Sequence, residues 1–468
     1  MTHLSPHAPP RWDARLWGAL ILLCGVLFLD GLDVSMVGVA LPSIQSDLGL
    51  TTSQLQWVVS GYVLGYGGLL LLGGRMADLL GRRRVLIAGL SVFTLASLAG
   101  GLVDNGTLLV LTRFLKGASA AFTAPAGLSI ITTTFTEGPA RNRALSIYTA
   151  TGASGFSLGL VFGGLLTELG WRWTFLLPVP VAAAILFFVP RLIRPDRPQL
   201  GERRRYDLPG AVALSAGMLL LVRTIVEAPN TGWTDVATIL PLAGAIALLV
   251  TFVAIERRTP QPLVRLGILR SASLVRANLG MATVFGAYVA FQFVGTLYLQ
   301  DTLGWSALHT ALAFLPGGAI VAFGAPRIGP LVDRFGTGPL IAVGAAAFVV
   351  GYALFLRVDA APYWLTFLPT MLLIGIGFAL CYPSLNIQAT MGVADHEQGL
   401  ASGLVNTSFQ VGGALVLAIV SAVASGSGDI IDVYRQAIAV VVGVAVLGLV
   451  VALSGLLPAR AEEVYAEA

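Results

Sequence analysis

The chain reads Gly74-Arg-Met-Ala-Asp78-Leu-Leu-Gly81 between its second and third apolar runs, and Gly329-Pro-Leu-Val-Asp333-Arg-Phe-Gly336 between its tenth and eleventh. Both stretches follow the pattern Gly-x-x-x-Asp-x-x-Gly. A segment repeated at equivalent places in a chain indicates duplicated structural units. Because the copies are eight runs apart, the pattern predicts two parallel six-helix repeats with two extra helices inserted between them.

The composition excludes most classes of soluble protein. Of the 468 residues, 56% are hydrophobic and 11% are charged, and the mean hydropathy is +0.83. Soluble proteins carry about 25% charged residues, so this surface cannot face water on all sides. A soluble enzyme, a disordered chain and a disulfide scaffold are excluded, and a polytopic membrane protein is predicted.

The apolar runs predict an all-α polytopic membrane protein with 14 transmembrane helices. Each run approaches the roughly 20 residues that a helix needs to span a bilayer, and in lipid a helix satisfies its own backbone hydrogen bonds. The runs lie at 16–42, 52–73, 83–103, 107–131, 143–167, 172–190, 209–227, 236–256, 273–299, 308–326, 338–356, 362–387, 399–424 and 436–457. The expected domains are a six-helix half (1–190), linkers with two inserted helices (191–272), and a second six-helix half with a tail (273–468).

Basic residues determine the expected orientation. Cytoplasmic loops of membrane proteins are enriched in Lys and Arg. With the N-terminus inside, 22 of the 28 basic residues fall on the cytoplasmic side. We therefore expect both termini in the cytoplasm. The chain has a single lysine against 27 arginines, which indicates a GC-rich bacterial genome, so the expected location is the bacterial inner membrane. The basic excess then marks topology, and no nucleic-acid partner is expected.

Four charged residues lie inside predicted spans, where an unpaired charge is costly and a functional role is the default expectation. They are Asp30 and Asp33 in the first span and Arg113 and Lys116 in the fourth. Paired positions on antiparallel neighbours keep a constant index sum, which matches Asp33 with Arg113 and Asp30 with Lys116. The pairs would serve in proton coupling or gating, or only lock the two spans together.

Five segments carry a family resemblance. They are Leu32-Asp33-Val-Ser-Met-Val-Gly-Val-Ala-Leu-Pro42, Gly74 to Arg84, Arg113-Phe-Leu-Lys116-Gly117, Gly155 to Gly164, and Trp171-Arg-Trp-Thr-Phe-Leu-Leu-Pro-Val-Pro180. Together they resemble the major facilitator superfamily and, within it, the fourteen-helix drug:proton antiporter branch. Departures include Lys116 where the branch has Gln, and Leu160 where its antiporter motif has Pro.

The resemblance implies a transporter that is not an enzyme, works by alternating access, and exports lipophilic drugs or antibiotics in exchange for protons. A proton-coupled uptake symporter for a small organic solute is the alternative, and a non-transporting sensor or scaffold is a remote one. No cofactor or metal is expected beyond the proton as coupling ion. The expected partners are a small lipophilic substrate and membrane lipid, and the protein is expected to be a monomer.

The resemblance also assigns roles to small and loop residues. Gating at the cytoplasmic loops would involve Gly74, Asp78, Gly81, Arg82, Asp333 and Arg334. Packing at the antiporter motif would involve Gly155, Gly159, Gly163 and Gly164. Glycines four residues apart let another helix approach closely. We expect this stripe to seal the interface between the halves, with ordinary helix packing as the alternative.

The substrate site is expected near the midplane, where the halves meet. Aromatic and uncharged polar side chains in the spans are the candidates, although packing could explain any one of them. They are Tyr62, Tyr66, Tyr288, Gln292, Tyr382, Asn386, Asn406 and Gln410. Such a site favours a lipophilic compound over a sugar or a phosphate.

Overall fold

The computed structural model describes residues 12–136, 139–195, 208–259, 266–324, 327–357, 363–391, 393, 398–424 and 429–456. Every regular element in these ranges is helical, which confirms the all-α prediction. The bounds are α1 (Ala14–Leu48), α2 (Thr52–Leu80), α3 (Arg82–Leu102), α4 (Gly106–Thr134), α5 (Pro139–Leu169), α6 (Trp173–Leu176), α7 (Pro178–Leu192), α8 (Leu208–Thr231), α9 (Val236–Glu256), η1 (Leu266–Arg270), α10 (Ala272–Leu297), η2 (Tyr298–Thr302), α11 (Ala307–Gly324), α12 (Ile328–Phe335), α13 (Thr337–Phe355), α14 (Phe367–Thr390), α15 (Gln398–Ala424) and α16 (Ile430–Ser454).

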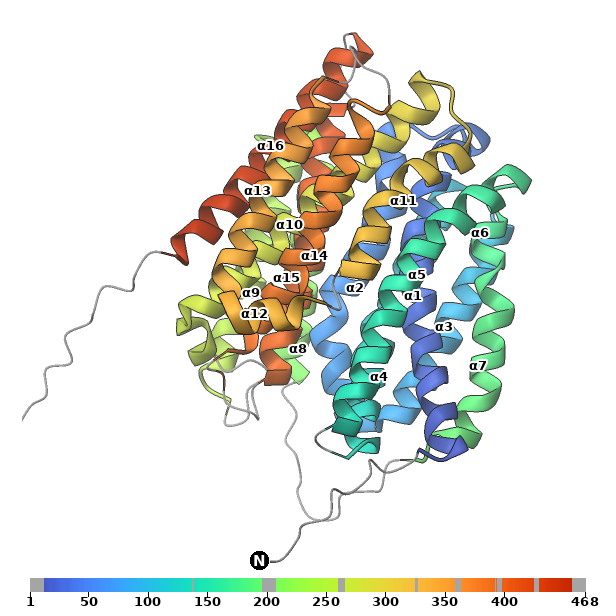
Figure 1. Cartoon of the computed structure of the whole chain (residues 1–468), viewed down its shortest axis with the longest axis vertical. Helices are drawn as coiled ribbons and strands as arrows, with labels where there is room; N and C mark the ends of the chain where they lie inside the picture. The colour runs from blue at the N-terminus through green and yellow to red at the C-terminus, as the bar shows by residue number, and fades with distance from the viewer. Residues whose placement is uncertain are drawn as a thin grey trace, which may run out of the picture.

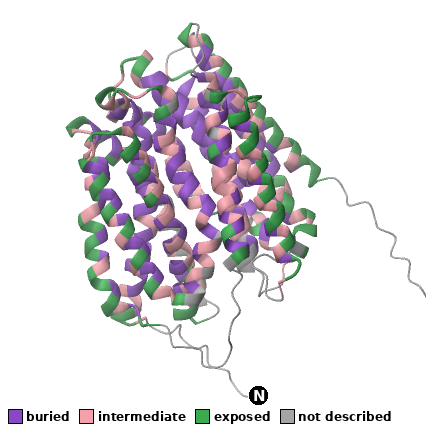
Figure 2. Cartoon of the chain, turned by 180° about the vertical axis from the view of Figure 1, so that it is seen from behind, coloured by how far each residue is buried: buried purple, intermediate pink, exposed green. Residues whose placement is uncertain are grey.

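Each predicted span lies on a helix, and eleven helices in the described part of the chain are long and apolar enough to cross a membrane. The sixth predicted span is divided between α6 and α7. Large apolar side chains such as Leu95, Leu240 and Val450 are more than half exposed. Exposed residues lie along the outside of the helix bundle (Figure 2). A multi-pass membrane protein explains this surface, because lipid then covers it. The exact count of fourteen spans stays a prediction.

Local sequence signals set several helix ends. Thr51 and Gln54 form a reciprocal capping box at the start of α2, and Asn105 accepts two backbone N–H bonds at the start of α4. These caps satisfy amide groups that have no partner within the helix. Gly49 ends α1 with a φ of 62°, a conformation that glycine adopts without strain.

The two copies of the repeated motif have related geometry. Gly81 is the one residue between α2 and α3, and Gly336 is the one residue between α12 and α13. Their φ angles are 93° and 77°, so both use the freedom of glycine to turn the chain sharply. We call the end of the bundle that holds these two glycines the motif end, and the opposite end, which holds Gly49 and Asp104, the far end.

The helices pack as two groups (Figure 1). In the first group, α1 packs on α5, α4 on α2 and α3, and α7 on α3. In the second, α10 packs on α15 and α16, and α14 packs on α11 and α13. The hairpin of α8 and α9 attaches through α8 to α2 and α15. The domain boundaries stay a prediction, and residues 196–207 and 260–265 of the two linkers lie outside the described residues.

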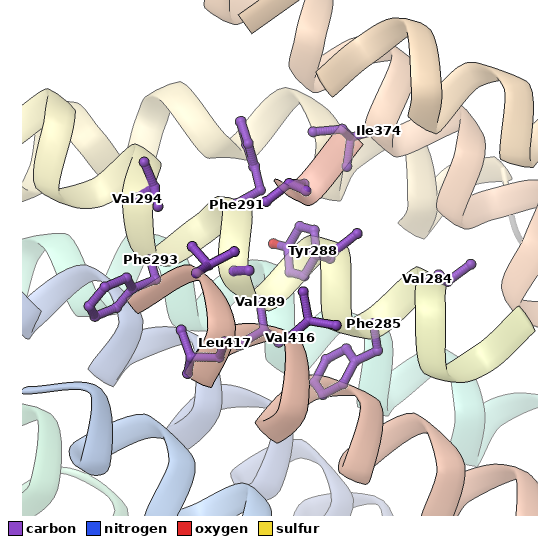
Figure 3. Close-up of a cluster of buried hydrophobic side chains, with 14 of the residues drawn as sticks. Val284, Phe285, Tyr288, Val289, Phe291, Phe293, Val294, Ile374, Val416 and Leu417 are labelled. Atoms are coloured by element: carbon purple, nitrogen blue, oxygen red, sulfur yellow. The ribbon is translucent and has the colours of Figure 1, made fainter. Parts of the chain in front are cut away.

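Helix α10 is the central element of the second group. From Gly280 to Leu297 its residues are almost all buried. Its side chains extend toward Ile374 of α14 and toward Val416 and Leu417 of α15 (Figure 3). Phe285 stacks on Phe409 of α15 with ring centroids 3.7 Å apart. Protein therefore surrounds this part of the helix.

The groups contact each other at mid-depth, where Gly67 of α2 lies against Gln410 of α15, and toward the far end. Gln300 Nε2 donates to the Val39 carbonyl of α1 at 2.9 Å, and Gly164 of α5 lies against Leu308 and Ala311 of α11. One hydrophobic cluster, which runs along the length of the second group, also includes Val37, Leu41 and Ile44 from the far half of α1. At the motif end, by contrast, the cluster around Leu20 and Leu86 draws its described members from α1 to α5 and α7 alone.

Candidate functional site

The site is built on α1 and α4, which run antiparallel and bring four charged residues to similar depth. Asp33 is completely buried, and Arg113 and Lys116 are 2% and 0% exposed. Asp33 Oδ2 accepts a hydrogen bond from Arg113 Nη1, while Asp33 Oδ1 accepts one from Lys116 Nζ. One carboxylate therefore serves two cations, and charge-assisted bonds of this kind are the strong ones.

Further contacts fix both cations. Arg113 Nε donates to the Val58 carbonyl of α2 at 2.9 Å, and its guanidinium lies 4.7 Å from the ring centroid of Tyr62. Lys116 Nζ lies 4.8 Å from the Phe93 centroid and 5.0 Å from the Phe175 centroid. Aromatic faces attract cations, most strongly where water is excluded. The cluster therefore ties α1 to α4 and also engages α2, α3 and α6.

The predicted pairing is half right. Asp33 binds Arg113 as expected, but Lys116 binds Asp33 rather than Asp30. Side chains lean toward the N-terminus of their own helix. Lys116 on α4 therefore leans toward the far end and reaches the depth of Asp33, whereas Asp30 on α1 leans toward the motif end. The constant index sum compares Cα positions and leaves this tilt out.

Asp30 occupies a different environment. Its side chain is 7% exposed, and Oδ2 is buried with no hydrogen-bond partner among the described residues. Tyr62 and Tyr66 of α2 and Tyr148 of α5 are close enough to interact with it electrostatically. The hydroxyl of Tyr62 is likewise buried and has no partner in the described part of the chain. Asp30 therefore has a buried carboxyl oxygen that makes no hydrogen bond with the described residues.

The glycine stripe packs on α1, which corrects the expectation that it seals the interface between the halves. A methyl group on Gly155 would lie 2.5 Å from the Phe28 carbonyl oxygen, and one on Gly159 would lie 2.1 Å from Ser35 Oγ. Gly163 faces the Met36 backbone in the same way. The four-residue spacing keeps these glycines on one face, and that face meets the neighbour within its own group. The stripe holds α5 against the part of α1 that carries Asp30 and Asp33.

Two other α5 residues face the second group. A methyl group on Gly164 would lie 2.7 Å from the Leu308 Cα atom of α11. Ser157 Oγ donates to the Gly318 carbonyl at 3.4 Å. Of the four motif glycines, Gly164 is therefore the one that contributes to packing between the groups.

The loop-motif residues lie at the motif end. Gly74 is inside α2, Gly81 makes the turn into α3, and Arg82 Nη1 donates to the Ser129 carbonyl at 3.5 Å. In the second copy, Asp333 and Arg334 belong to α12 and are exposed. Asp78 is within α2, but its side chain lies outside what the structure describes. The gating role of these residues stays a prediction.

The substrate candidates divide into two sets. Tyr62 and Tyr66 form an edge-to-face pair with centroids 6.1 Å apart. Tyr288 and Tyr382 both contact Phe378, at 5.3 and 6.1 Å. The other candidates do not join this arrangement. Gln292 lies against Gly38, Asn386 donates to the Tyr382 carbonyl of its own helix, and Gln410 lies against Gly67. Asn406 is not without a partner.

A series of aromatic side chains links the two groups. We did not predict this series from the sequence. Phe156 of α5 contacts Tyr288 of α10 at 5.9 Å, and the series continues through Phe378 and Tyr382 of α14 to Phe409 of α15. Phenylalanine is equally common in lipid-facing and interior positions, so no signal in the sequence separates these rings from the rest. Aromatic side chains of this kind are typical of sites for apolar ligands.

A second polar cluster lies at the far end, on Arg172. Its Nη1 donates to Asp47 Oδ2 at 2.6 Å and its Nη2 donates to Asp104, while Trp171 Nε1 donates to the same Asp47 oxygen at 2.9 Å. The hydrogen bond with Asp47 raises the pKa of Arg172 above its ordinary value. Arg172 lies in the Trp-Arg-Trp segment that carries part of the family resemblance, but the sequence did not predict which acids it binds.

The chain is similar to known proteins along most of its length. The family model described as Major Facilitator Superfamily matches residues 23–417. The cephamycin export protein CmcT of Amycolatopsis lactamdurans is 39% identical over 455 residues, which cover 95% of this chain and 93% of that protein. The puromycin resistance protein pur8 of Streptomyces alboniger is 39% identical, over 89% of this chain and 83% of its own length.

The fold is also known from solved structures. The crystal structure of PepTSo, a transporter of the POT family, superimposes with a TM-score of 0.70 and covers 96% of this chain and all of its own length. Its sequence is 16% identical, so the likeness concerns the fold alone.

Proposed function

We propose, because the chain belongs to the Major Facilitator Superfamily, that it exports lipophilic antibiotics from the cell in exchange for protons. The observation that carries this proposal is the likeness along nearly the whole chain to a cephamycin export protein and a puromycin resistance protein. These names refer to two different antibiotics. The likeness therefore supports antibiotic export as a class more than any one substrate.

The buried cluster on α1 and α4 supports proton coupling. Asp33, Arg113 and Lys116 are almost completely withdrawn from solvent, and charges in such a place are retained where they serve a function. A carboxyl group inside the protein can be loaded with a proton on one side and unloaded on the other when its surroundings change. The proton gradient would then drive the antibiotic outward.

The proposed topology has fourteen spans with the motif end in the cytoplasm. The eleven apolar helices, together with α2, α5 and α8, give this number. Both termini would then be cytoplasmic in a bacterial inner membrane, and the protein would act as a monomer. The packing of α1 and α5 against α10 and α11 near the far end supports an inward-facing state, in which the outer side is closed.

The substrate would bind between the groups, next to Tyr62, Tyr66, Tyr288 and Tyr382. These aromatic side chains come from α2, α10 and α14, and Phe156 of α5 extends the same series. Large apolar surfaces with a few polar groups are typical of sites for lipophilic small molecules. The loop-motif residues at Gly81 and Gly336 would bend as the groups rock.

The test is a resistance screen followed by a direction assay. An efflux-deficient bacterial strain that expresses the protein is grown against puromycin, lincomycin, a cephamycin and tetracenomycin C, with Asp33→Asn as the inactive reference. We expect resistance to at least one compound, and acid-driven accumulation of that compound in everted vesicles. Energised uptake by intact cells would instead indicate a symporter, and unchanged proton-driven transport by Asp33→Asn would exclude a role for Asp33 in coupling.

A further inference from the structure

We infer that Asp30, rather than Asp33, is the carboxyl group that accepts and releases the transported proton. The inference rests on the proton-coupled export proposed above and names the group that carries the proton in it. Asp33 and Asp30 are one helical turn apart on α1, yet the structure gives their carboxyl oxygens opposite surroundings.

Both carboxylate oxygens of Asp33 are engaged in ion pairs, so neither is available to a proton. Oδ2 holds Arg113 and Oδ1 holds Lys116, and all three side chains are at most 2% exposed. Protonation would turn an acceptor into a donor and leave two buried cations facing a neutral group. Removing one partner of a buried pair is strongly unfavourable, because the charge left behind has no water to solvate it.

Asp30 can take a proton without breaking a bond that the structure records. Its Oδ2 is buried and has no hydrogen-bond partner among the described residues, as is also true of the Tyr62 hydroxyl. The carboxylate form can accept from such a hydroxyl, and the acid form can donate to it. The step is a simple transfer: water gives a proton to the Asp30 carboxylate, and the acid later returns it to water on the other side.

Asp30 lies nearer to the motif end than the ion pairs do and is slightly more accessible. It is 7% exposed, whereas Asp33 and Lys116 are completely buried. Its side chain leans toward the motif end, because side chains tilt toward the N-terminus of their helix. At that end the described hydrophobic cluster stays within the first group. A proton from the motif end would therefore reach Asp30 before it reaches the ion pairs.

One proton on Asp30 changes the net charge of the cluster formed by Asp30, Asp33, Arg113 and Lys116. Ionised Asp30 and Asp33 offset Arg113 and Lys116, so the cluster is neutral, and protonated Asp30 leaves it with a charge of about +1. The titratable groups that face Asp30 come from four helices. They are Asp33 of α1, Tyr62 and Tyr66 of α2, Lys116 of α4, and Tyr148 of α5.

Transport in proteoliposomes tests the inference. The full chain, Asp30→Asn, Asp33→Asn and the control Asp432→Asn, which changes an exposed acid of α16, are reconstituted and supplied with a radiolabelled form of the antibiotic to which the resistance screen shows resistance. We expect Asp30→Asn to lose accumulation driven by a pH gradient but to keep counterflow of that antibiotic at equal pH, which needs no net proton transfer. Accumulation by Asp30→Asn at the wild-type level would overturn the inference while leaving proton-coupled export intact. A wild-type protein that ignores the pH gradient would overturn both.

Infrared difference spectroscopy between acidic and alkaline pH gives a second readout that does not depend on a substrate. The carbonyl stretch of a buried protonated carboxyl group should be present in the wild type and in Asp432→Asn, and missing in Asp30→Asn. A band that survives in Asp30→Asn and disappears in a folded Asp33→Asn would assign the proton to Asp33 instead. Gel filtration of each variant establishes that it is folded.

Discussion

Lys116 donates to Asp33 in an ion pair whose two side chains are both completely buried. Asp33 also binds Arg113, so the three residues alone carry one surplus positive charge. Asp30 lies close enough to Lys116 to offset that charge electrostatically. Lys116 is the single lysine of the chain, which otherwise uses arginine for all its basic side chains. Its compact ammonium group fits between the rings of Phe93 and Phe175, where a planar guanidinium would need more room.

Replacement of Lys116 by methionine should destabilise the protein. The variant keeps the chain length but removes one partner of a buried pair, which costs roughly 3 kcal/mol in the free energy of unfolding. Adding Asp30→Asn should recover part of the loss, because Asp33 and Arg113 then balance each other. Unfolding in mixed detergent measures both effects, with Arg435→Met, in an exposed pair with Asp432, as the control. A Lys116→Met protein as stable as the wild type would contradict the importance of the pair.

Gly159→Ala should disrupt the packing of α5 on α1. The new methyl group would lie 2.1 Å from Ser35 Oγ and 2.6 Å from the Leu32 carbonyl oxygen, and the backbone atom cannot turn away. Overpacking of this kind costs about 1–3 kcal/mol. Gly443→Ala in α16 is the matched control, because its methyl group would meet nothing within 4 Å. Melting temperatures in detergent should fall for the first variant and stay level or rise for the second, and equal values would refute the close contact.

The sequence specified the fold better than it specified the contacts of the site. Hydropathy and the repeated loop predicted the helices, because lipid demands long apolar segments whatever their neighbours are. The same reasoning brought Asp33 and Arg113 together through their equal depth. It failed for Lys116, since the tilt of long side chains decides which acid they reach. It also failed for Gly155, Gly159 and Gly163, because a small-residue face shows that a helix approaches closely but not which helix approaches.

Arg172→Gln should have a small effect, although Arg172 joins two acids. Arg172 and Asp47 are 34% and 46% exposed, and Asp104 is 83% exposed. Exposed ion pairs contribute about 0.2–1 kcal/mol, and salt screens them. We expect a slight fall in melting temperature that largely disappears in about 1 M salt, where the Debye length is roughly 3 Å. A loss as large as that of Lys116→Met would show that this cluster holds the far end together.

Cross-linking α5 to α11 should stop transport, because alternating access requires the far end to open. A Cβ atom on Gly318 would lie 3.6 Å from the Ser157 Cβ atom, within the 3.5–4.5 Å of disulfides. We expect Ser157→Cys with Gly318→Cys to form a bond under mild oxidation, to block antibiotic accumulation in everted vesicles, and to recover in reductant. Native Cys24 and Cys381 are buried and free, so each single-cysteine variant controls for them. A further control is a disulfide within the second group, made by Gly324→Cys with Ala379→Cys. A Cβ atom on Gly324 would lie 3.3 Å from the Ala379 Cβ atom. This cross-link should leave transport active. Undiminished transport by the cross-linked α5–α11 protein would contradict movement at this contact.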